Sequence, residues 1–212
     1  MDSVVCMGGG FSVAMGMSKA FEVSGETGKK VFGVVGDSTF FHSGMTGLAN
    51  AVFNKHDVLL VILDNGTTAM TGHQPNPGVC TSVLGEGCNH LDIESVVRGI
   101  GVTDVAKVKP FNMRGTLKTI EEMKARSGVR VIIAEEPCML FARRTLKQNR
   151  PQVAEVATQG EEALKCLAEL ACPAFRRGGT AEAPVVSVDE SQCSGCMVCL
   201  QVTPAIRARK RS

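Results

Sequence analysis

The sequence contains no tryptophan and no tyrosine, so nine phenylalanines are the only aromatic side chains among its 212 residues. Its 23 glycines indicate a backbone-dense fold with many tight turns. The first residues show neither the basic segment nor the apolar segment of an export signal. The longest aliphatic run, residues 58–63, is far too short to span a bilayer. These absences predict a cytoplasmic protein with no membrane partner.

A strong excess of charge of either sign is also lacking. The 23 basic and 21 acidic residues give a net charge of +2. Without the four basic residues Arg207, Arg209, Lys210 and Arg211, the balance would be 19 minus 21, or −2. The basic character therefore belongs to the C-terminal end, and no nucleic-acid partner is expected. Such a terminal run is most often a solvated, mobile end.

Short β-branched segments alternate with helical patterns over the first two thirds of the chain. Buried parallel strands are predicted at residues 31–35, 58–63 and 129–134, with weaker ones at 3–6 and 102–108. Helices are predicted at residues 11–23, 45–53, 93–100 and 113–125. This alternation predicts an α/β fold, a doubly wound parallel sheet with helices on both faces. Ligands should bind at the carboxyl ends of its strands.

Two of the predicted strands end in polar loops. The first is followed by residues 36–39 (Gly-Asp-Ser-Thr) and the second by residues 64–68 (Asp-Asn-Gly-Thr-Thr). Either loop alone is more often a simple turn, but both fall at the same edge of the sheet. Asp37, Asn65 and the Thr67 carbonyl would suit Mg²⁺. Small residues, and a helix expected to begin near Ser43, would let backbone N–H groups approach a diphosphate.

Nine cysteines are many for this length, and three form a Cys-x₂-Cys-x₂-Cys run at Cys193, Cys196 and Cys199. Thiols clustered in this way indicate metal binding in a reducing compartment rather than disulfides. The spacing is typical of an iron–sulfur cluster, and in two-cluster ferredoxins a cysteine followed by proline serves the opposite cluster. The alternative is that the run binds zinc or a three-iron cluster, although zinc usually takes cysteines in pairs.

The fourth ligand is predicted upstream, at Cys172-Pro173, because the downstream position holds Thr203-Pro204. One complete ligand set is then Cys172, Cys193, Cys196 and Cys199. The other set would need Gly160, Ala163, Cys166 and Thr203, of which three cannot bind iron as thiolates. The sequence therefore predicts one [4Fe-4S] cluster in a degenerate ferredoxin-like α+β domain, with Cys166 left as a core thiol. The domain boundary is predicted between residues 147 and 148, giving domains 1–147 and 148–212.

The strand-end loops also carry a resemblance to a known family. Residues 36–44, 63–65 and 67–74 resemble the alpha subunit of indolepyruvate ferredoxin oxidoreductases, and the similarity extends from about residue 2 to 206. This resemblance implies that Asp37, Asn65 and the Thr67 carbonyl hold Mg²⁺ against thiamine diphosphate. It implies further cofactor contacts from Cys6, Met7, Gly8, Gly36, Ser38, Thr39, Thr68 and Met70. His42 would lie near the reacting centre, as a proton donor or a contact to the substrate carboxylate.

The resemblance further implies an activity. It is the oxidative decarboxylation of an aryl 2-oxoacid such as indolepyruvate to an acyl-coenzyme A, with electrons passed through the cluster to ferredoxin. The family ordinarily has an N-terminal pyrimidine-binding domain, and this chain starts almost at the first strand of the diphosphate-binding domain. We therefore expect a fragment, or a subunit completed by a partner in a hetero-oligomer, that turns over nothing alone.

Other functions and roles stay open. The enzyme could act on pyruvate or 2-oxoglutarate, or the chain could be an electron-transfer subunit without thiamine chemistry, although Asp37 and Asn65 argue against the latter. The basic C-terminal end could attract an acidic electron carrier. His73 is a weaker candidate than His42. Surface, capping or core roles are expected of His56, His90, Cys80, Cys88 and Cys138.

Overall fold

The structure, a computed structural model, describes residues 3–26, 28–82, 84–85, 89–144 and 150–211. It divides into two compact units, one of residues 1–110 with 115–141 and one of residues 111–114 with 142–212. The predicted boundary between residues 147 and 148 falls outside the described residues and stays a prediction. None of the described helices is long and apolar enough to cross a membrane.

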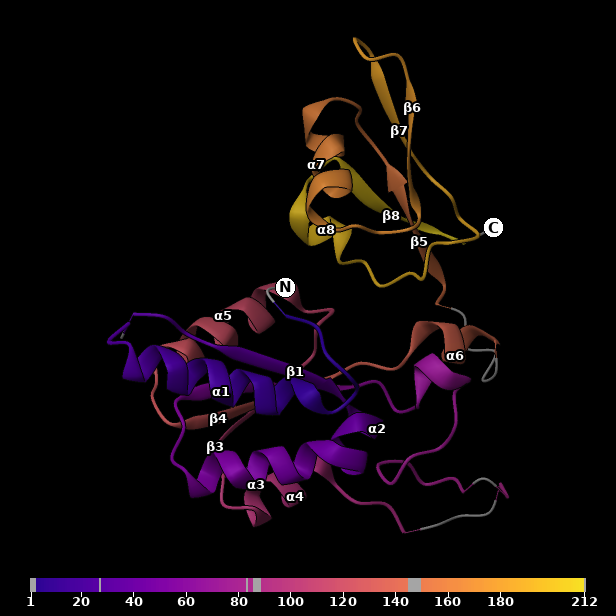
Figure 1. Cartoon of the computed structure of the whole chain (residues 1–212). Coiled ribbons are helices and arrows are strands. Elements are labelled where there is room, and N and C mark those ends of the chain that lie inside the picture. Colours follow the sequence, from indigo (N-terminus) through magenta and orange to yellow (C-terminus); the bar gives the residue numbers. More distant parts are fainter. Residues whose placement is uncertain (1–2, 27, 83, 86–88, 145–149, 212) are drawn as a thin grey trace. The chain divides into compact units, whose positions relative to one another are not determined.

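The first unit is built on a four-stranded parallel sheet in the order β1-β2-β4-β3 (Figure 1). Its strands are β1 (Phe32–Gly36), β2 (Val58–Asp64), β3 (Asp104–Val108) and β4 (Val129–Glu135). The helices up to residue 144 are α1 (Gly9–Val23), α2 (Asp37–Thr39), α3 (Met45–Phe53), α4 (Ile93–Gly99), α5 (Met113–Lys124) and α6 (Met139–Arg144). A π-helical segment, η1 (Phe40–Gly44), and a 3₁₀ segment, η2 (Ala69–Thr71), complete the unit.

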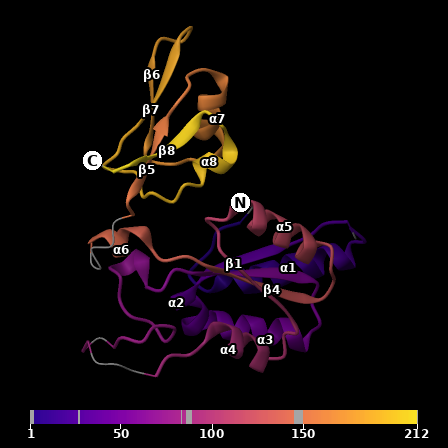
Figure 2. The ribbon, with the colours of Figure 1, turned by 180° about the vertical axis from the view of Figure 1, so that it is seen from behind.

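Different helices bury the two faces of this sheet (Figure 2). On one face the strands share a core with α1, α3 and α4, which contribute the buried Phe11, Leu48 and Val97. On the other face a smaller core includes Met123 of α5. Because helices pack on both faces, the sequences of the strands are nearly continuous apolar runs. The predicted doubly wound parallel sheet is confirmed.

Helix α5 covers part of one face of the sheet and leaves the β1 side of that face uncovered. Phe32 and Val34 of β1 are 42% and 49% exposed, and Leu63 of β2 is 46% exposed. All three lie on the same face, because Leu63 pairs in register with Gly36 and side chains alternate along a strand. β1 is also the terminal strand of the sheet order. An apolar strip is therefore present at this edge of the sheet.

Two local predictions are wrong. Residues 3–6 form no strand, and Val4 and Val5 are exposed. The helix expected to begin near Ser43 begins instead at Asp37, directly after β1, and continues through η1 into α3. Gly36 is extended, with φ −80° and ψ 165°, and no side chain caps the helix that follows it. The chain therefore passes from strand to helix without the polar N-cap that would mark the junction in the sequence.

The second unit consists of two strand–helix–strand halves. Its elements are β5 (Gln152–Val156), α7 (Glu161–Glu169), β6 (Phe175–Gly179), β7 (Pro184–Val188), α8 (Cys199–Val202) and β8 (Ile206–Lys210). The outer strands β5 and β8 pair antiparallel, and so do β6 and β7. Val153, Phe175 and Ile206 are buried in the core that the two halves share. This arrangement confirms the ferredoxin-like α+β appendage.

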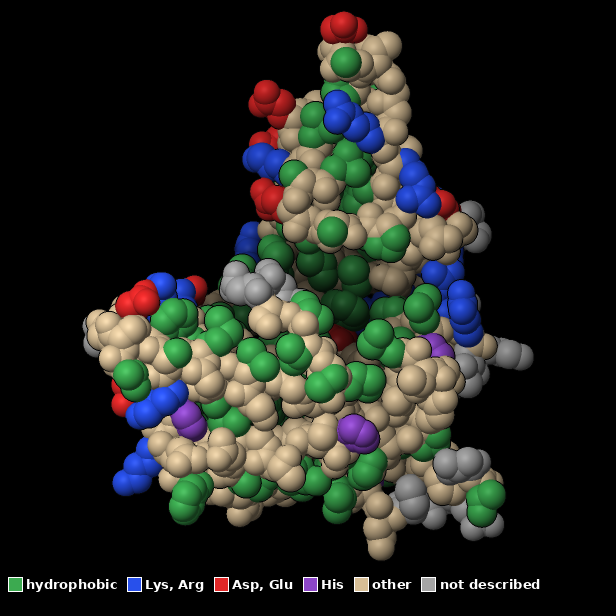
Figure 3. Space-filling model, viewed as in Figure 1, with side chains coloured by type: hydrophobic (Ala, Val, Ile, Leu, Met, Phe, Trp, Pro, Cys, Tyr) green, Lys and Arg blue, Asp and Glu red, His purple; other side chains and the backbone are tan. Residues whose placement is uncertain are grey.

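The basic C-terminal end is a strand rather than the mobile tail expected from the sequence. Arg209 pairs in register with Val153 of β5, and this backbone ladder fixes the segment. Arg207 donates to a carboxylate oxygen of Glu155 at 2.8 Å, and Arg209 pairs with Glu190. On the face shown in Figure 3, acidic and basic side chains lie next to one another along the left margin of each unit. Arg207 and Arg209 therefore have local acidic partners.

Candidate functional site

The strands β1 and β2 end side by side at one edge of the sheet. Gly36, the last residue of β1, pairs in register with Leu63 of β2. Asp37 and Asn65 therefore follow at neighbouring strand ends, as the sequence predicts. The carboxyl edge of a parallel sheet is where ligands bind in folds of this class.

Two side-chain hydrogen bonds tie the loop after β1 to the segment that follows β2. The Thr68 hydroxyl donates to Ser38 Oγ at 2.9 Å. Asn76 Nδ2 donates to Asp37 Oδ2 at 3.0 Å, and the Ser38 backbone N–H donates to Asp37 Oδ1 at 2.8 Å. Asp37 is only 3% exposed. Its carboxylate is thus held at both oxygens, and each oxygen keeps a lone pair for a further ligand.

Asn76 is a site residue that the sequence reasoning missed. Its side chain is buried, and its Oδ1 accepts from the Gly78 backbone N–H at 2.8 Å. An asparagine between two prolines and ahead of a glycine indicates a turn in which the side chain bonds to its own backbone. That signal could have located the turn. It could not have revealed the contact with Asp37, which lies 39 residues away.

Asn65 and Thr67 form the other half of this edge. Asn65 Oδ1 accepts from the Thr67 backbone N–H at 3.1 Å. Thr67 is 2% exposed, and its hydroxyl donates to the Gln74 carbonyl at 3.4 Å. A carboxylate, a carboxamide and a main-chain carbonyl match the oxygen-only ligands of Mg²⁺, which also takes phosphate oxygens and water. A Cβ added at Gly36 would meet nothing within 4 Å, so the backbone beside Asp37 leaves room for a diphosphate.

Electrostatics at this edge favour a cation. Burial raises the pKa of Asp64, and the nearby Asp37 carboxylate raises it further. A bound cation would relieve this repulsion between like charges. Within the described part of the chain, no three His, Cys, Asp or Glu side chains converge on one point where a metal ion could sit. A magnesium site here therefore depends on Asn65, on the Thr67 carbonyl and on phosphate oxygens.

His42 and the turn at residues 6–8 both lie against the side chain of Ser43. His42 belongs to η1, and π-helical segments are frequent at functional sites. Its Nδ1 is 2.9 Å from Ser43 Oγ. Gly8 has φ 90°, and a Cβ added there would fall 1.9 Å from the same hydroxyl oxygen. Cys6 accepts a backbone hydrogen bond from Gly9 at 3.0 Å, which closes the turn through Met7. The structure thus brings these predicted residues together.

The other candidates of the first unit differ in their surroundings. Thr39 is buried beside Asp37, whereas Met70 in η2 is 92% exposed. His73 stacks on the Phe141 ring, with 5.3 Å between ring centroids. Cys80 Sγ lies 3.4 Å from His90 Nδ1 on exposed side chains, as expected of loop residues. Cys88 lies outside the described residues.

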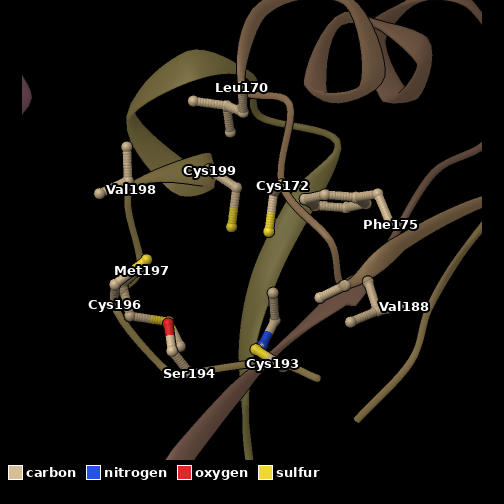
Figure 4. A pocket seen from close by; sticks show the side chains of 12 residues that line it. Leu170, Cys172, Phe175, Val188, Cys193, Ser194, Cys196, Met197, Val198 and Cys199 are labelled. Carbon is tan, nitrogen blue, oxygen red and sulfur yellow. Dashed lines mark hydrogen bonds between the residues drawn. The ribbon is translucent and has the colours of Figure 1, made fainter. Parts of the chain in front are cut away.

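In the second unit the four predicted cluster ligands line one cavity of about 230 Å³ (Figure 4). Cys172 follows α7, Cys193 and Cys196 lie in the loop before α8, and Cys199 begins α8. The sulfurs of Cys172 and Cys199 point into the same hollow in Figure 4. The remaining lining is mainly apolar and includes Leu170, Phe175 and Val188. Thiols around a hollow suit an iron–sulfur cluster, whose four cysteines bind different irons.

The backbone beside these cysteines adopts uncommon conformations. Ala171, Gly195 and Met197 have φ values of 43°, 74° and 60°, and each adjoins Cys172 or Cys196. Left-handed conformations at residues other than glycine cost about 1–3 kcal/mol and concentrate at functional sites. A Cβ added at Gly195 would lie 2.6 Å from the Gln152 carbonyl oxygen. Glycine is therefore the residue that fits there.

The Cys199 thiol at the cavity is protonated unless a metal displaces the proton. Burial, and to a lesser extent the neighbouring cysteines, raise the pKa of the Cys199 thiol to about 12. Iron binds thiolates, so loading of this site would release protons. The Ala154 backbone N–H also donates to Cys193 Sγ at 3.4 Å. Hydrogen bonds of this kind to sulfur are among the factors that set cluster potentials.

Three positions of the other predicted ligand set, Ala163, Cys166 and Thr203, are packed or hydrogen-bonded. Ala163 and Cys166 have no exposed surface, and burial raises the pKa of the Cys166 thiol to about 11. Thr203 donates to a Glu162 carboxylate oxygen at 3.0 Å and accepts from the Ala205 backbone N–H at 3.2 Å. Protein contacts thus occupy these positions. They match the interpretation of Cys166 as a core thiol.

A parallel sheet with a carboxylate and a carboxamide at adjoining strand ends forms a ligand-binding edge that suits a metal-bound diphosphate, as the resemblance to thiamine enzymes implies. Comparison with known families agrees. The chain belongs to the thiamine pyrophosphate enzymes, because residues 1–134 match the family described as "Thiamine pyrophosphate enzyme, C-terminal TPP binding domain".

Among curated proteins, the chain is similar to indolepyruvate oxidoreductase subunit IorA, which confirms the resemblance seen in the sequence. It is 37% identical to the protein of Archaeoglobus fulgidus over 205 residues and 40% identical to that of Methanothermobacter marburgensis over 204 residues. Each match covers 96% of this chain and 31% of the relative, so the chain spans about a third of the length of these relatives.

Among solved structures, the fold is similar to that of 2-oxoglutarate:ferredoxin oxidoreductase from Magnetococcus marinus. The TM-score is 0.53 at 20% sequence identity, over 62% of this chain and 46% of that one. At this identity the similarity concerns the fold.

Proposed function

We propose that this chain is the thiamine-diphosphate-binding and iron–sulfur part of a 2-oxoacid:ferredoxin oxidoreductase that acts on an aryl 2-oxoacid of the indolepyruvate kind. One observation carries the proposal: the same chain combines two joined loops at the β1–β2 edge with a cavity lined by four thiols. A thiamine enzyme that performs no oxidation would have no use for such a cavity. The similarity to indolepyruvate oxidoreductase subunits supports the choice of substrate.

In the first unit, Asp37, Asn65 and the Thr67 carbonyl would hold Mg²⁺ and, through it, the diphosphate. When bound, thiamine diphosphate supplies the nucleophilic carbon and the electron sink for decarboxylation. Asn76 fixes the orientation of the Asp37 carboxylate. Further contacts to the cofactor would come from the remaining predicted residues of this edge and of the N-terminal turn: Cys6, Met7, Gly8, Gly36, Ser38, Thr39, Thr68 and Met70.

His42 would act on the substrate. It is exposed and lies against Ser43, which also contacts Gly8. An imidazole ring can donate a proton or bind the substrate carboxylate. Coenzyme A would take the acyl group.

In the second unit, Cys172, Cys193, Cys196 and Cys199 would hold one [4Fe-4S] cluster and give electrons an exit to ferredoxin. A pyrimidine-binding domain, from a partner subunit or from a longer chain, would complete the cofactor site. The chain alone should therefore bind thiamine diphosphate weakly and turn over nothing. Decarboxylation of an arylpyruvate by the purified chain without a partner would contradict this arrangement.

The decisive experiment is anaerobic purification of the chain with iron, sulfide and thiamine diphosphate measured on the same sample. One cluster predicts about four irons per chain. Near eight irons would contradict the single-cluster assignment. Iron and sulfide without any magnesium-dependent affinity for thiamine diphosphate would instead support an electron-transfer subunit with a scaffold domain.

The substrate requires the assembled complex. Arylpyruvates should be oxidised in preference to pyruvate and 2-oxoglutarate, with ferredoxin as electron acceptor. Preference for pyruvate or 2-oxoglutarate would keep the class of enzyme and overturn the proposed substrate.

A further inference from the structure

The loop that carries the clustered cysteines is held by the side chain of Arg211. The Arg211 guanidinium donates to the Cys193 carbonyl at 2.8 Å, to the Glu190 carbonyl at 3.2 Å and to the Arg150 carbonyl at 3.3 Å. Its own backbone N–H donates to the Pro151 carbonyl at 2.8 Å. One side chain thus joins the start of β5 to the segment that leads into the cysteine run.

Arg211 differs in this respect from the other arginines of the same end. Arg207 pairs with Glu155 and is 66% exposed at its side chain, and Arg209 pairs with Glu155 and Glu190. Within the described part of the chain, by contrast, the guanidinium of Arg211 bonds to carbonyl oxygens and forms no ion pair with a carboxylate. Its positive charge therefore lies beside the main chain of Cys193.

A positive charge at this place has a defined effect on a redox centre. Cys193 is one of the four thiols around the cavity, and its sulfur already accepts the Ala154 N–H. Reduction adds one negative charge to the cluster, so a nearby guanidinium stabilises the reduced form more than the oxidised form. Net charge and hydrogen bonding near the sulfurs are the means by which proteins set cluster potentials.

We propose that Arg211 is a positioning residue of the iron–sulfur site: it fixes the main chain at Cys193, and its charge raises the reduction potential of the cluster. This inference rests on the proposed [4Fe-4S] site at Cys172, Cys193, Cys196 and Cys199. It concerns a residue that binds no iron itself.

The test compares R211Q and R211K with R207Q in the full chain, purified anaerobically and reconstituted with iron and sulfide. R211Q and R207Q each remove one positive charge from the same end of the chain. Of the two, R211Q is the variant that also removes the hydrogen bonds to the loop of Cys193. Iron and sulfide per chain are measured together with the reduction potential, by titration followed with electron paramagnetic resonance. R211Q should have a more negative potential than the wild type. R211K and R207Q should stay close to the wild type.

Loss of the cluster in R211Q with retention in R211K would support the inference through the positioning role. A potential and iron content in R211Q equal to those of R207Q would overturn it. A potential in R211K as negative as in R211Q would overturn the role of charge. If the wild-type chain bound no iron and sulfide, the proposed function would fail as well. Failure of the inference alone would instead leave a normal cluster in every variant.

Discussion

At the scale of single residues, Asn76 orients the carboxylate on which the proposed magnesium site depends. Replacing it by alanine removes the hydrogen bond to Asp37 Oδ2. Hydrogen bonds to charged groups contribute about 1.5–3 kcal/mol. We expect N76A to weaken the magnesium-dependent binding of thiamine diphosphate by about tenfold or more, measured by isothermal titration calorimetry. The control is N54A, because among the described residues the Asn54 side-chain amide bonds only to Asn50, near the end of α3. Affinity in N76A equal to that of the control would contradict the role assigned to Asn76.

Gly195 offers a second test at this scale. Alanine there would keep φ 74° and bring a Cβ within 2.6 Å of the Gln152 carbonyl oxygen. The strain should lower the free energy of unfolding by about 1–3 kcal/mol and reduce iron incorporation. Thermal unfolding and iron analysis measure both effects. The matched control is Gly16 in α1, where an added Cβ meets nothing within 4 Å. G16A should be neutral or stabilising by about 0.5–1 kcal/mol.

At the scale of elements, α4 begins with a side-chain cap. Asp92 accepts from the Ser95 backbone N–H at 2.7 Å, and this hydrogen bond is the main cause of its lowered pKa. A carboxyl group with a lowered folded pKa stabilises the protein above its unfolded pKa, and this contribution is lost as the pH falls through the folded value. D92A should therefore cost about 1 kcal/mol at neutral pH, and the difference from wild type should shrink below about pH 4.

Urea unfolding at several pH values measures this effect. D92N keeps a capping oxygen without the charge, so its stability at neutral pH should lie between those of the wild type and of D92A. A cost of D92A that did not change on acidification would show that the carboxylate contributes nothing as a charge.

Long elements could be predicted from the sequence, whereas junctions and distant contacts could not. The aliphatic segment at β2 indicates a strand and the amphipathic segment at α3 indicates a helix, and tertiary contacts change neither of them. The start of α2 at Asp37 was missed because Gly36 gives no capping signal. The end of the chain was taken for a mobile tail because its basic residues hide a strand whose partner, β5, lies more than fifty residues earlier. At the site, the meeting of two loops followed from topology, but Asn76 and Arg211 act through contacts that no local pattern encodes.

At the scale of the whole molecule, the uncovered strip on the β1 side of the sheet should govern self-association. Exposed apolar strips on a terminal strand favour pairing between chains. We expect V34K to reduce self-association, measured by light scattering over a range of concentrations. Because Val34 is 49% exposed, unfolding should change by less than about 0.5 kcal/mol. The neighbouring V35K buries a charge at a position that is 6% exposed, so it should cost more than about 3 kcal/mol. Unchanged association of V34K would show that this strip is inert.

The loss of the other predicted ligand set has a consequence for the order in which electrons leave the site. Oxidation of one 2-oxoacid releases two electrons, and a single [4Fe-4S] cluster takes up one at a time. With Ala163 and Thr203 where further ligands would stand, the described part of the second unit offers no second complete set of cysteine ligands for a cluster that could hold the other electron. Under the proposed function, the cluster must be emptied once in the middle of each turnover. The speed at which a carrier collects the first electron then sets how soon the second can leave.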